Sequence, residues 1–364
     1  MAAVTRLEEI VVRAAEPGEG RAIAGLWHEL WDAHESWGGY AASRDPRVYA
    51  QLADRLEEDA RVRAGQAVLG RHVHLVAIHR GVVAGQVEGW FERHGSDDTT
   101  PFTCEVRSLI VTTKLRKTGA GRALLDTLAR TVARLARGAS TVLAAEVLEP
   151  NPAHAFYAKV GYVPVAWTVR IPCDGTSEAP PRRGLHLPGT SEAPPRRDFL
   201  VARVAEAGDA LAVALLEAAL AARRRAAGDV RFDRPKAVDA TLISAIAAHL
   251  GRPGTGPSDP VEIVTADAEG RVQASATFAV GALDPPFIPS KRAVVGRFAL
   301  DPAQDPTALV GPLVAIGRRL AAQRGAPHLE LTDLTAPGTP IHHAALAAGA
   351  RPWSRIVTRH IPGQ

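Results

Sequence analysis

The sequence lacks several features that define whole classes of protein. Its two cysteines, Cys104 and Cys173, form neither a metal-binding pattern nor a disulfide framework. No apolar run approaches the roughly 18 residues that a membrane-spanning helix needs. The charged N-terminal stretch 1–10 also lacks the apolar region of a signal peptide. We therefore expect a cytoplasmic protein with no metal and no membrane partner.

The charge is nearly balanced as well. Lys and Arg number 43 and Asp and Glu 39, which leaves a formal net charge of +4. No basic block is long enough to bind nucleic acid, so we expect no nucleic-acid partner. A length of 364 residues and a hydrophobic fraction of 46% suit two ordinary globular domains.

Hydrophobic periodicity predicts the same order of elements in two halves of the chain. The first half has predicted strands at 10–14, 74–79, 82–92, 102–112, 141–147 and 163–171, with helices at 19–34, 47–63, 119–137 and 152–160. The second half has predicted strands at 199–204, 261–266, 271–280, 292–300, 328–332 and 352–361, with helices at 208–227, 237–250, 306–324 and 340–348. The pattern predicts two copies of one α/β fold with a mixed sheet.

A Pro-rich direct repeat separates the halves. The segment 175–183 recurs unchanged as 189–197, without apolar periodicity. Such a segment is typical of an exposed linker. We expect a first domain at 1–172, a linker at 173–198 and a second domain at 199–364.

A short basic and glycine-rich segment carries most of the functional information. Residues 116–121 read Arg-Lys-Thr-Gly-Ala-Gly and join a predicted strand to a predicted helix. Glycines let the backbone approach a ligand closely, and free N–H groups at a helix start attract anions. The spacing matches neither nucleotide-binding glycine motif. The segment therefore indicates a phosphate site, with an ordinary turn before a helix as the alternative.

A second segment follows about thirty residues later. Residues 151–162 read Asn-Pro-Ala-His-Ala-Phe-Tyr-Ala-Lys-Val-Gly-Tyr and come after a predicted strand. Together with Arg-x-x-Gly-x-Gly, this segment resembles the motifs of the GNAT superfamily of acyltransferases, over roughly residues 9–172. The resemblance implies a tandem pair of GNAT-like domains joined by the linker. It also implies an N-acyltransferase that uses acetyl-CoA as cosubstrate without a metal, acting on a small-molecule amine as a monomer or homodimer.

The resemblance also implies which residues bind the coenzyme. Tyr157 would stand beside the coenzyme sulfur and protonate the leaving thiolate. Asn151 would cap the helix that carries Tyr157. The coenzyme-binding residues implied in this way are Leu109, Ile110, Val111, Arg116, Lys117, Thr118, Gly119, Ala120, Gly121, Arg122, Asn151 and Tyr157, the first three through their backbone.

Glu105 is the candidate base. On a regular strand it would share one face with Leu109, four residues later. Some members of the superfamily carry a glutamate at this position, where it removes the amine proton. The alternative is a structural glutamate paired with an arginine such as Arg107.

The acceptor is expected between the first two predicted helices and the central strands. Glu35 and Glu88 are candidates to pair with a cationic amine, although either can equally be a solvated surface charge. The loop 37–40 is a candidate for specificity because loops usually carry it. We expect His28 and His34 to be structural or solvated.

The second half lacks the phosphate motif. Its corresponding segment, 301–309, brings Asp301 and Asp305 and two prolines, which remove N–H donors. Ala345 falls where Tyr157 stands. We expect this half to keep the fold without the activity. Other functions compatible with the sequence are acetylation of a protein or peptide, and acyl-CoA sensing without catalysis.

Overall fold

The computed structural model describes residues 10–93, 102–173, 200–227, 229, 237–252, 259–283, 286–288, 290–334 and 339–363. The linker expected at 173–198 lies outside these residues apart from Cys173. The chain forms two compact units. The first unit comprises Met1–Val165, Asp284–Pro289 and Ser354–Gln364, and the second unit comprises Ala166–Leu283 and Ser290–Trp353.

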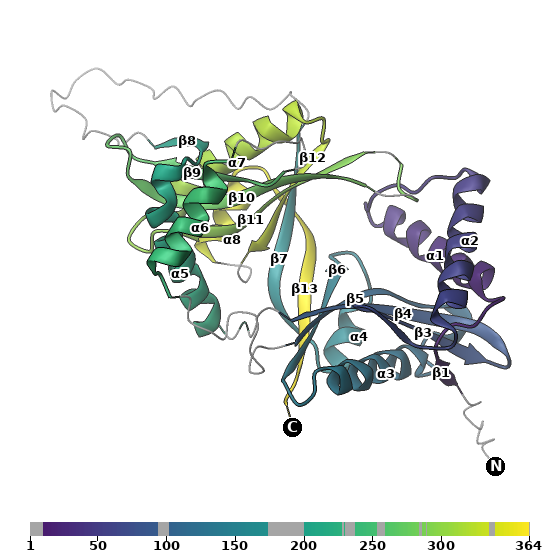
Figure 1. Ribbon diagram of the computed structural model, residues 1–364. Helices are drawn as coiled ribbons and strands as arrows, with labels where there is room; N and C mark the ends of the chain where they lie inside the picture. The colour runs from purple at the N-terminus through teal and green to yellow at the C-terminus, as the bar shows by residue number, and fades with distance from the viewer. Residues whose placement is uncertain are drawn as a thin grey trace, which may run out of the picture. The chain divides into compact units, whose positions relative to one another are not determined.

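The first unit is built on a mixed sheet with strand order β1-β3-β4-β5-β6-β13 (Figure 1). Its strands are β1 Val11–Arg13, β2 Val68–Leu69, β3 His72–His79, β4 Val82–Arg93, β5 Phe102–Val111, β6 Thr141–Leu148 and β13 (Arg351–Ile361, from Ser354 on). Its α-helices are α1 Gly20–Ser36, α2 Pro46–Arg63, α3 Ala120–Leu135 and α4 His154–Lys159. A 3-10 turn, η1, spans Thr113–Leu115.

Helices cover both faces of this sheet. Helix α3 presents an apolar stripe, Leu124, Leu125, Leu128 and Val132, which is fully buried together with α4 residues against one face. Each such leucine contributes about 1.5–3 kcal/mol to folding. Helices α1 and α2 pack against the other face through residues such as Ile23 and Leu56.

A β-bulge interrupts β5. Arg107 lies opposite Glu88 and Ile110 opposite Gln86, so that two residues of β5 face one residue of β4. Ser108 adopts a φ of +53° there, which is unusual for a residue other than glycine. The extra residue reverses the alternation of side chains. Leu109 therefore packs in the same core cluster as Cys104, so the expectation that it shares a face with Glu105 is wrong.

Strands β5 and β6 separate halfway along their length. They pair in parallel from Phe102 and Thr141 to Glu105 and Ala144. Both strands then continue without pairing to each other, β5 to Val111 and β6 to Leu148. The first unit thus has a gap between two neighbouring strands of its sheet.

The outer neighbour of β6 comes from the far end of the chain. Residues of β13 pair antiparallel with all of β6, from Ser354 opposite Leu148 to Ile361 opposite Thr141. Arg355 forms a two-point ion pair with Glu149 at 2.6–2.8 Å. The domain boundaries 1–172 and 199–364 therefore remain a prediction from the repeated order of elements. The compact units do not follow them, because the first unit also contains residues from the C-terminal end of the chain.

The strands of the second unit follow the order β7-β12-β11-β10-β9-β8. Its strands are β7 (Val163–Pro172, from Ala166 on), β8 Val201–Val204, β9 Val261–Ala266, β10 Val272–Ala282, β11 Lys291–Leu300 and β12 His328–Leu334. Its α-helices are α5 Ala210–Ala226, α6 Ala240–Leu250, α7 Pro306–Gln323 and α8 Pro340–Ala347, and a 3-10 turn, η2, spans Ala207–Asp209.

The predicted fold class is confirmed. Each helix and strand expected from periodicity is present in the described part of the chain, with ends shifted by a few residues. The short β2 and the 3-10 turns η1 and η2 were not predicted, because segments of two or three residues carry no periodic signal.

Candidate active site

A pocket of about 920 Å³ lies in the first unit, and its walls come from α1, β5, β6, η1, α3 and α4. The gap between β5 and β6 opens into it, since Val106 and Ser108–Val111 line one side and Glu146 and Val147 the other. Most of the predicted coenzyme-binding residues meet here. Those lining the pocket are Leu109, Ile110, Val111, Arg116, Lys117, Gly119, Gly121, Arg122, Asn151 and Tyr157.

One end of the pocket is the start of α3. Gly119 precedes the helix with a φ of +98°, a conformation that glycine adopts without strain. No side chain caps this helix end. The first backbone N–H groups of α3 are therefore available to an external acceptor, and the helix dipole favours a negative one.

Four cations surround the same end: Arg116, Lys117, Arg122 and Lys159 line the pocket. The guanidinium groups of Arg116 and Arg122 donate only to backbone carbonyls, those of Val111 at 3.4 Å and Lys159 at 3.5 Å. Within the described ranges, none of the four forms an ion pair with a carboxylate. A concentration of unpaired positive charge beside free N–H groups suits a ligand with several negative charges.

Two predicted coenzyme-binding residues do not line the pocket. The hydroxyl of Thr118 donates to the carbonyl of Leu115 at 2.7 Å and so stabilises the turn before α3. Ala120 is buried in the first turn of that helix. Thr118 and Ala120 therefore shape the loop before α3. Direct contact of either side chain with a coenzyme stays a prediction.

Tyr157 lies in α4 with its ring between those of Phe156 and Tyr162, at centroid distances of 5.5 and 5.1 Å. Burial raises the pKa of Tyr157, so the phenol keeps its proton at neutral pH. Helix α4 can approach α3 because a Cβ at Gly121 would lie only 3.2 Å from the Phe156 ring. The tyrosine is thus a protonated donor in the wall of the pocket.

Asn151 does not cap α4 in the expected way. Its Oδ1 accepts the N–H of Ala153 at 2.9 Å, which forms a turn before the helix. The residue at the N-cap is Ala153, and α4 begins at His154, two residues later than predicted. The turn occupies the residues at which the periodicity placed the first helical turn.

Glu105 lies outside the pocket lining. Its side chain is 55% exposed and accepts from the guanidinium of Arg107 at 2.6 Å. This is the ion pair that the sequence offered as the alternative to a catalytic role. Reaching an amine in the pocket would require Glu105 to leave this partner, and a role as base remains a prediction.

The two carboxylates expected to hold the acceptor are engaged elsewhere. Glu35 forms an ion pair with Arg44 at 2.9 Å. Glu88 lies 3.7 Å from the Nε2 of His72. Burial opposes ionisation of Glu88, but His72 and neighbouring cations outweigh it and lower the pKa of this carboxyl. Neither glutamate lines the pocket.

The pocket is also lined by Glu29 and His34 of α1, by Trp37 directly after this helix, and by Glu146 of β6. Trp37, within the loop 37–40, is a candidate for specificity from the sequence, and His34 is expected there to be structural or solvated, whereas the sequence selects neither Glu29 nor Glu146. The hydroxyl of Ser354, in β13, donates to Glu146 at 2.5 Å. Periodicity places His34 on a helix but does not tell which part of the helix surface faces a cavity. The signal for Glu146 is weaker still, since a glutamate in a strand commonly faces solvent.

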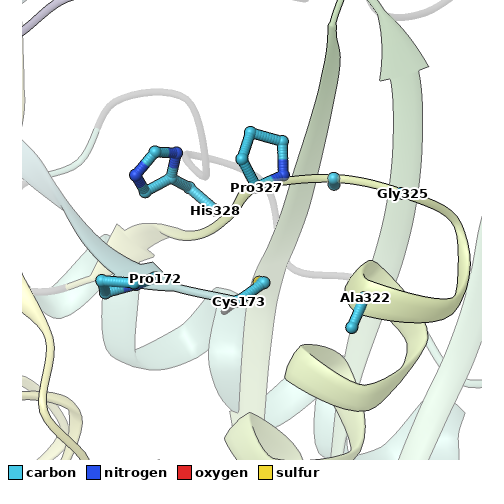
Figure 2. Close-up of a pocket in the computed structure, with 7 residues that line it drawn as sticks. Pro172, Cys173, Ala322, Gly325, Pro327 and His328 are labelled. Carbon is cyan, nitrogen blue, oxygen red and sulfur yellow. The ribbon is translucent and has the colours of Figure 1, made fainter. Parts of the chain in front are cut away.

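The second unit contains a smaller cavity of about 400 Å³, where the end of β7 meets the start of β12 (Figure 2). Its lining residues are Pro172, Cys173, Ala322, Gly325, Ala326, Pro327 and His328. The N–H of Cys173 donates to the carbonyl of Pro327 at 2.8 Å. This lining carries no arginine, lysine or carboxylate, so it lacks the means to hold a highly charged coenzyme.

No group of three or more His, Cys, Asp or Glu side chains in the described part of the chain is placed to hold a metal ion. Among the helices described, none combines the length and apolar character that crossing a membrane requires.

Comparison with known proteins identifies the domain that holds the pocket. Residues 25–162 match the family model of the acetyltransferase (GNAT) family. The matched stretch includes the separated strands, the loop before α3 and the helix that carries Tyr157. The chain contains a GNAT acetyltransferase domain. Proteins of this family are generally acyltransferases, and the family binds CoA or acetyl-CoA.

Solved structures extend the likeness beyond the GNAT domain. A GCN5-related N-acetyltransferase from Sphaerobacter thermophilus is 16% identical, with 98% of this chain and 97% of that chain covered and a TM-score of 0.55. A glucosamine N-acetyltransferase region of a fungal multi-domain β-N-acetylglucosaminidase is 12% identical, with 97% and 38% covered and a TM-score of 0.53. A tandem GNAT protein from the clavulanic acid biosynthesis pathway is 16% identical, with 97% and 98% covered and a TM-score of 0.46. At these identities the likeness concerns the fold. No curated protein matches the chain.

Proposed function

We propose that the first unit is an acyl-CoA-dependent N-acyltransferase that transfers an acetyl group from acetyl-CoA to an amine of a small molecule. The observation that carries the proposal is the continuity of one pocket. It runs from unpaired cations at an uncapped helix start to a protonated tyrosine and a gap between two strands. The cations and the helix start match the phosphates of the coenzyme, the gap between the strands matches its extended arm, and the tyrosine matches its sulfur.

Each part of the coenzyme has a counterpart in this pocket. The pyrophosphate binds the first N–H groups of α3, with Arg116 and Arg122 contributing charge. The pantetheine arm enters the gap and adds to the edge of β5 through the backbone of Leu109 and Val111, as a further strand would. The thioester is then held beside Tyr157.

The transfer needs few protein groups. The neutral amine attacks the thioester carbon, the new C–N bond forms and the C–S bond breaks. The departing thiolate takes the phenolic proton of Tyr157, and the amide nitrogen loses its remaining extra proton. Backbone N–H groups near the bulge in β5 face the developing oxyanion. No covalent intermediate on the protein is required.

The second unit is proposed to lack coenzyme binding. Helix α7 starts after Asp305, whose carboxylate accepts the N–H of Thr307 at 3.0 Å. Pro306, in the first turn, has no N–H to offer. A negative charge and an occupied donor therefore stand where the first unit offers free donors and cations.

Native mass spectrometry and a thiol-release assay test the proposal together. We expect one coenzyme A bound per chain, and release of free thiol when acetyl-CoA is mixed with a panel of amines. Coenzyme bound without thiol release from any amine would indicate an acyl-CoA sensor. Release with peptides but not with small amines would indicate a peptide acetyltransferase. Absence of coenzyme binding would contradict all three readings.

A further inference from the structure

The acceptor end of the pocket is formed largely by one face of α1. Glu29, Leu30 and His34 of this helix line the pocket, together with Trp37 directly after it. The opposite face of α1, with Ile23, packs in the core of the first unit. The coenzyme requires the basic end of the pocket, so the side chains on this helix face are left to meet the acceptor.

Glu29 differs from the other carboxylates of α1. Asp32 and Glu35 both bind the guanidinium of Arg44. Glu29 has no hydrogen bond or ion pair with any residue that the structure describes. An uncompensated carboxylate in a pocket wall attracts a positively charged group of a ligand.

His34 also has an open position in the wall. Its ring lies 5.6 Å from that of Trp37, and its nitrogens have no partner among the described residues. Burial lowers the pKa of His34, so the imidazole is neutral at physiological pH and keeps a lone pair that can take a proton. The charged groups lining the pocket with it are Glu29 on its own helix, Glu146 on β6, and Arg116, Lys117, Arg122 and Lys159 at the coenzyme end.

We propose that His34 takes the proton from the attacking ammonium group and that Glu29 binds a second positive charge of the same acceptor. The substrate class is therefore a small amine with at least two cationic groups, such as a diamine or an amino sugar with several amines. This inference rests on the proposed function, because it assigns the acceptor end of the same pocket.

The protons balance across the transfer. His34 removes one proton from the ammonium, and the resulting amine attacks the thioester. The nitrogen, now bonded to carbon, loses a second proton as the thiolate receives one from Tyr157, so the phenol is restored directly or through water. His34 then returns its proton to solvent. The net products are the amide, the free thiol and one proton.

The first experiment replaces the imidazole. His34→Ala should lower kcat/KM by about 10²-fold, in the range for a general base, with the affinity for coenzyme A unchanged by calorimetry. Added imidazole should restore much of the lost rate, which a merely structural role would not allow. In the variant, kcat/KM should rise with pH up to the pKa of the free amine. His28→Ala is the matched control, since His28 is on the same helix but outside the pocket lining.

Two outcomes would overturn the assignment of His34. One is a rate unchanged by His34→Ala, and the other is a loss that imidazole does not rescue. Glu146→Gln is measured alongside, because Glu146 is the other proton acceptor in this part of the pocket. A selective loss at low pH in Glu146→Gln, with none in His34→Ala, would transfer the role to Glu146.

The second experiment tests the charge selectivity. Glu29→Gln should raise the KM for a diamine about tenfold and leave the KM for a monoamine of similar length nearly unchanged. Glu35→Gln, which removes a carboxylate already paired with Arg44, should alter neither. Equal effects of the two substitutions, or a wild-type preference for the monoamine, would contradict the inference.

The wild-type assay distinguishes a failure of this inference from a failure of the proposed N-acyltransferase function. A chain that binds coenzyme A but releases no thiol with any amine contradicts the proposed function. A chain that is active, but equally so in His34→Ala and Glu29→Gln, contradicts only the assignment of the acceptor end.

Discussion

The two units keep the same sheet devices but differ at one helix start. Strand β11 carries a bulge like that of β5: Arg297, like Ser108, has a positive φ, at +57° and +53°. The parallel pairing of β11 with β12 ends at Val295 and Leu331, as that of β5 with β6 ends at Glu105 and Ala144. Both units thus keep a bulged strand beside a neighbour from which it separates.

The two units differ at the start of the helix that follows this strand, α3 in the first unit and α7 in the second. Helix α3 starts at an uncapped Gly119, and α7 starts at an aspartate that caps its own first turn. A fold is maintained by dozens of buried side chains, whereas an anion site at a helix start depends on a few residues. The fold can therefore persist after the residues that would bind the coenzyme have changed.

A second difference lies beneath the first two helices of each unit. In the first unit His74 and Gln86 are buried and hydrogen-bonded to each other, and half-buried Glu88 lies opposite His74. In the second unit buried Glu262 accepts from the hydroxyl of Thr277 on the neighbouring strand. Burial raises the pKa of Glu262 to about 7. In the first unit, neighbouring imidazoles keep the pKa of Glu88 below its usual value. The first unit thus favours an ionised carboxyl at Glu88 on β4, and the second unit favours a neutral one at Glu262 on β9.

Removal of the last strand, β13, should have the largest effect on the first unit. A chain ending at residue 350 lacks β13, which pairs with β6 along its whole length and adds an ion pair to Glu149. We expect such a chain to lose coenzyme binding, because the β6 side of the pocket loses its neighbour strand. Calorimetry and circular dichroism on the truncated protein check this. Intact binding would show that the pocket does not need β13.

Tyr157 provides the next largest effect. Tyr157→Phe keeps the ring packing but removes the proton donor, so turnover should fall about 10²–10⁴-fold with coenzyme affinity nearly constant. The second unit has Ala345 at the related sequence position, so it has no phenolic proton donor to remove. Steady-state and single-turnover kinetics check the prediction. An unchanged chemical step would remove Tyr157 from the mechanism.

Gly119 tests the helix start itself. Gly119→Asp imitates the acidic start of α7 and should weaken coenzyme A binding by about tenfold or more, because it adds negative charge where the phosphates bind. Gly119→Ala is the matched control, since it introduces the same backbone strain without the charge. Calorimetry compares the two variants. Unchanged affinity at one copy per chain in Gly119→Asp would place the coenzyme away from the start of α3.

Glu262 gives a pH-dependent stability effect in the second unit. Its pKa of about 7 in the folded chain lies above the value of 4.5 for a free glutamate. Its contribution to stability is thus fully present below pH ~4.5 and is lost as pH rises through about 7. Glu262→Gln should therefore raise the free energy of unfolding relative to wild type by about 1–3 kcal/mol at pH 8. The increase should be smaller at pH 5. Denaturant unfolding at the two pH values measures this, and an equal effect at both would contradict it.

Glu105 carries the smallest expected effect. Its ion pair with Arg107 is exposed, and such pairs contribute about 0–1 kcal/mol. We expect Glu105→Gln to change kcat/KM by less than about threefold at any pH. A loss that grows as pH falls would instead support Glu105 as the base and restore the interpretation taken from the sequence alone.

The sequence predicted the elements well because each carries a local signal. The stripe of leucines in α3 and the short apolar runs of β3 and β4 are visible within a dozen residues. The phosphate loop was also readable, since its glycines and cations are consecutive. These features depend on neighbours in the chain, and so the amino-acid order was sufficient.

The amino-acid order was thus enough to predict the order of strands and helices, the basic loop before α3 and the tyrosine of α4. Other features depend on contacts between distant segments. The bulge at Ser108 has no glycine to signal it, yet it turns Leu109 away from the face of Glu105. The partner of β6 lies about two hundred residues away in β13, and the acceptor end of the pocket depends on which side of α1 faces β5 and β6. Such contacts are set by packing between distant segments, and no local pattern in the sequence records them.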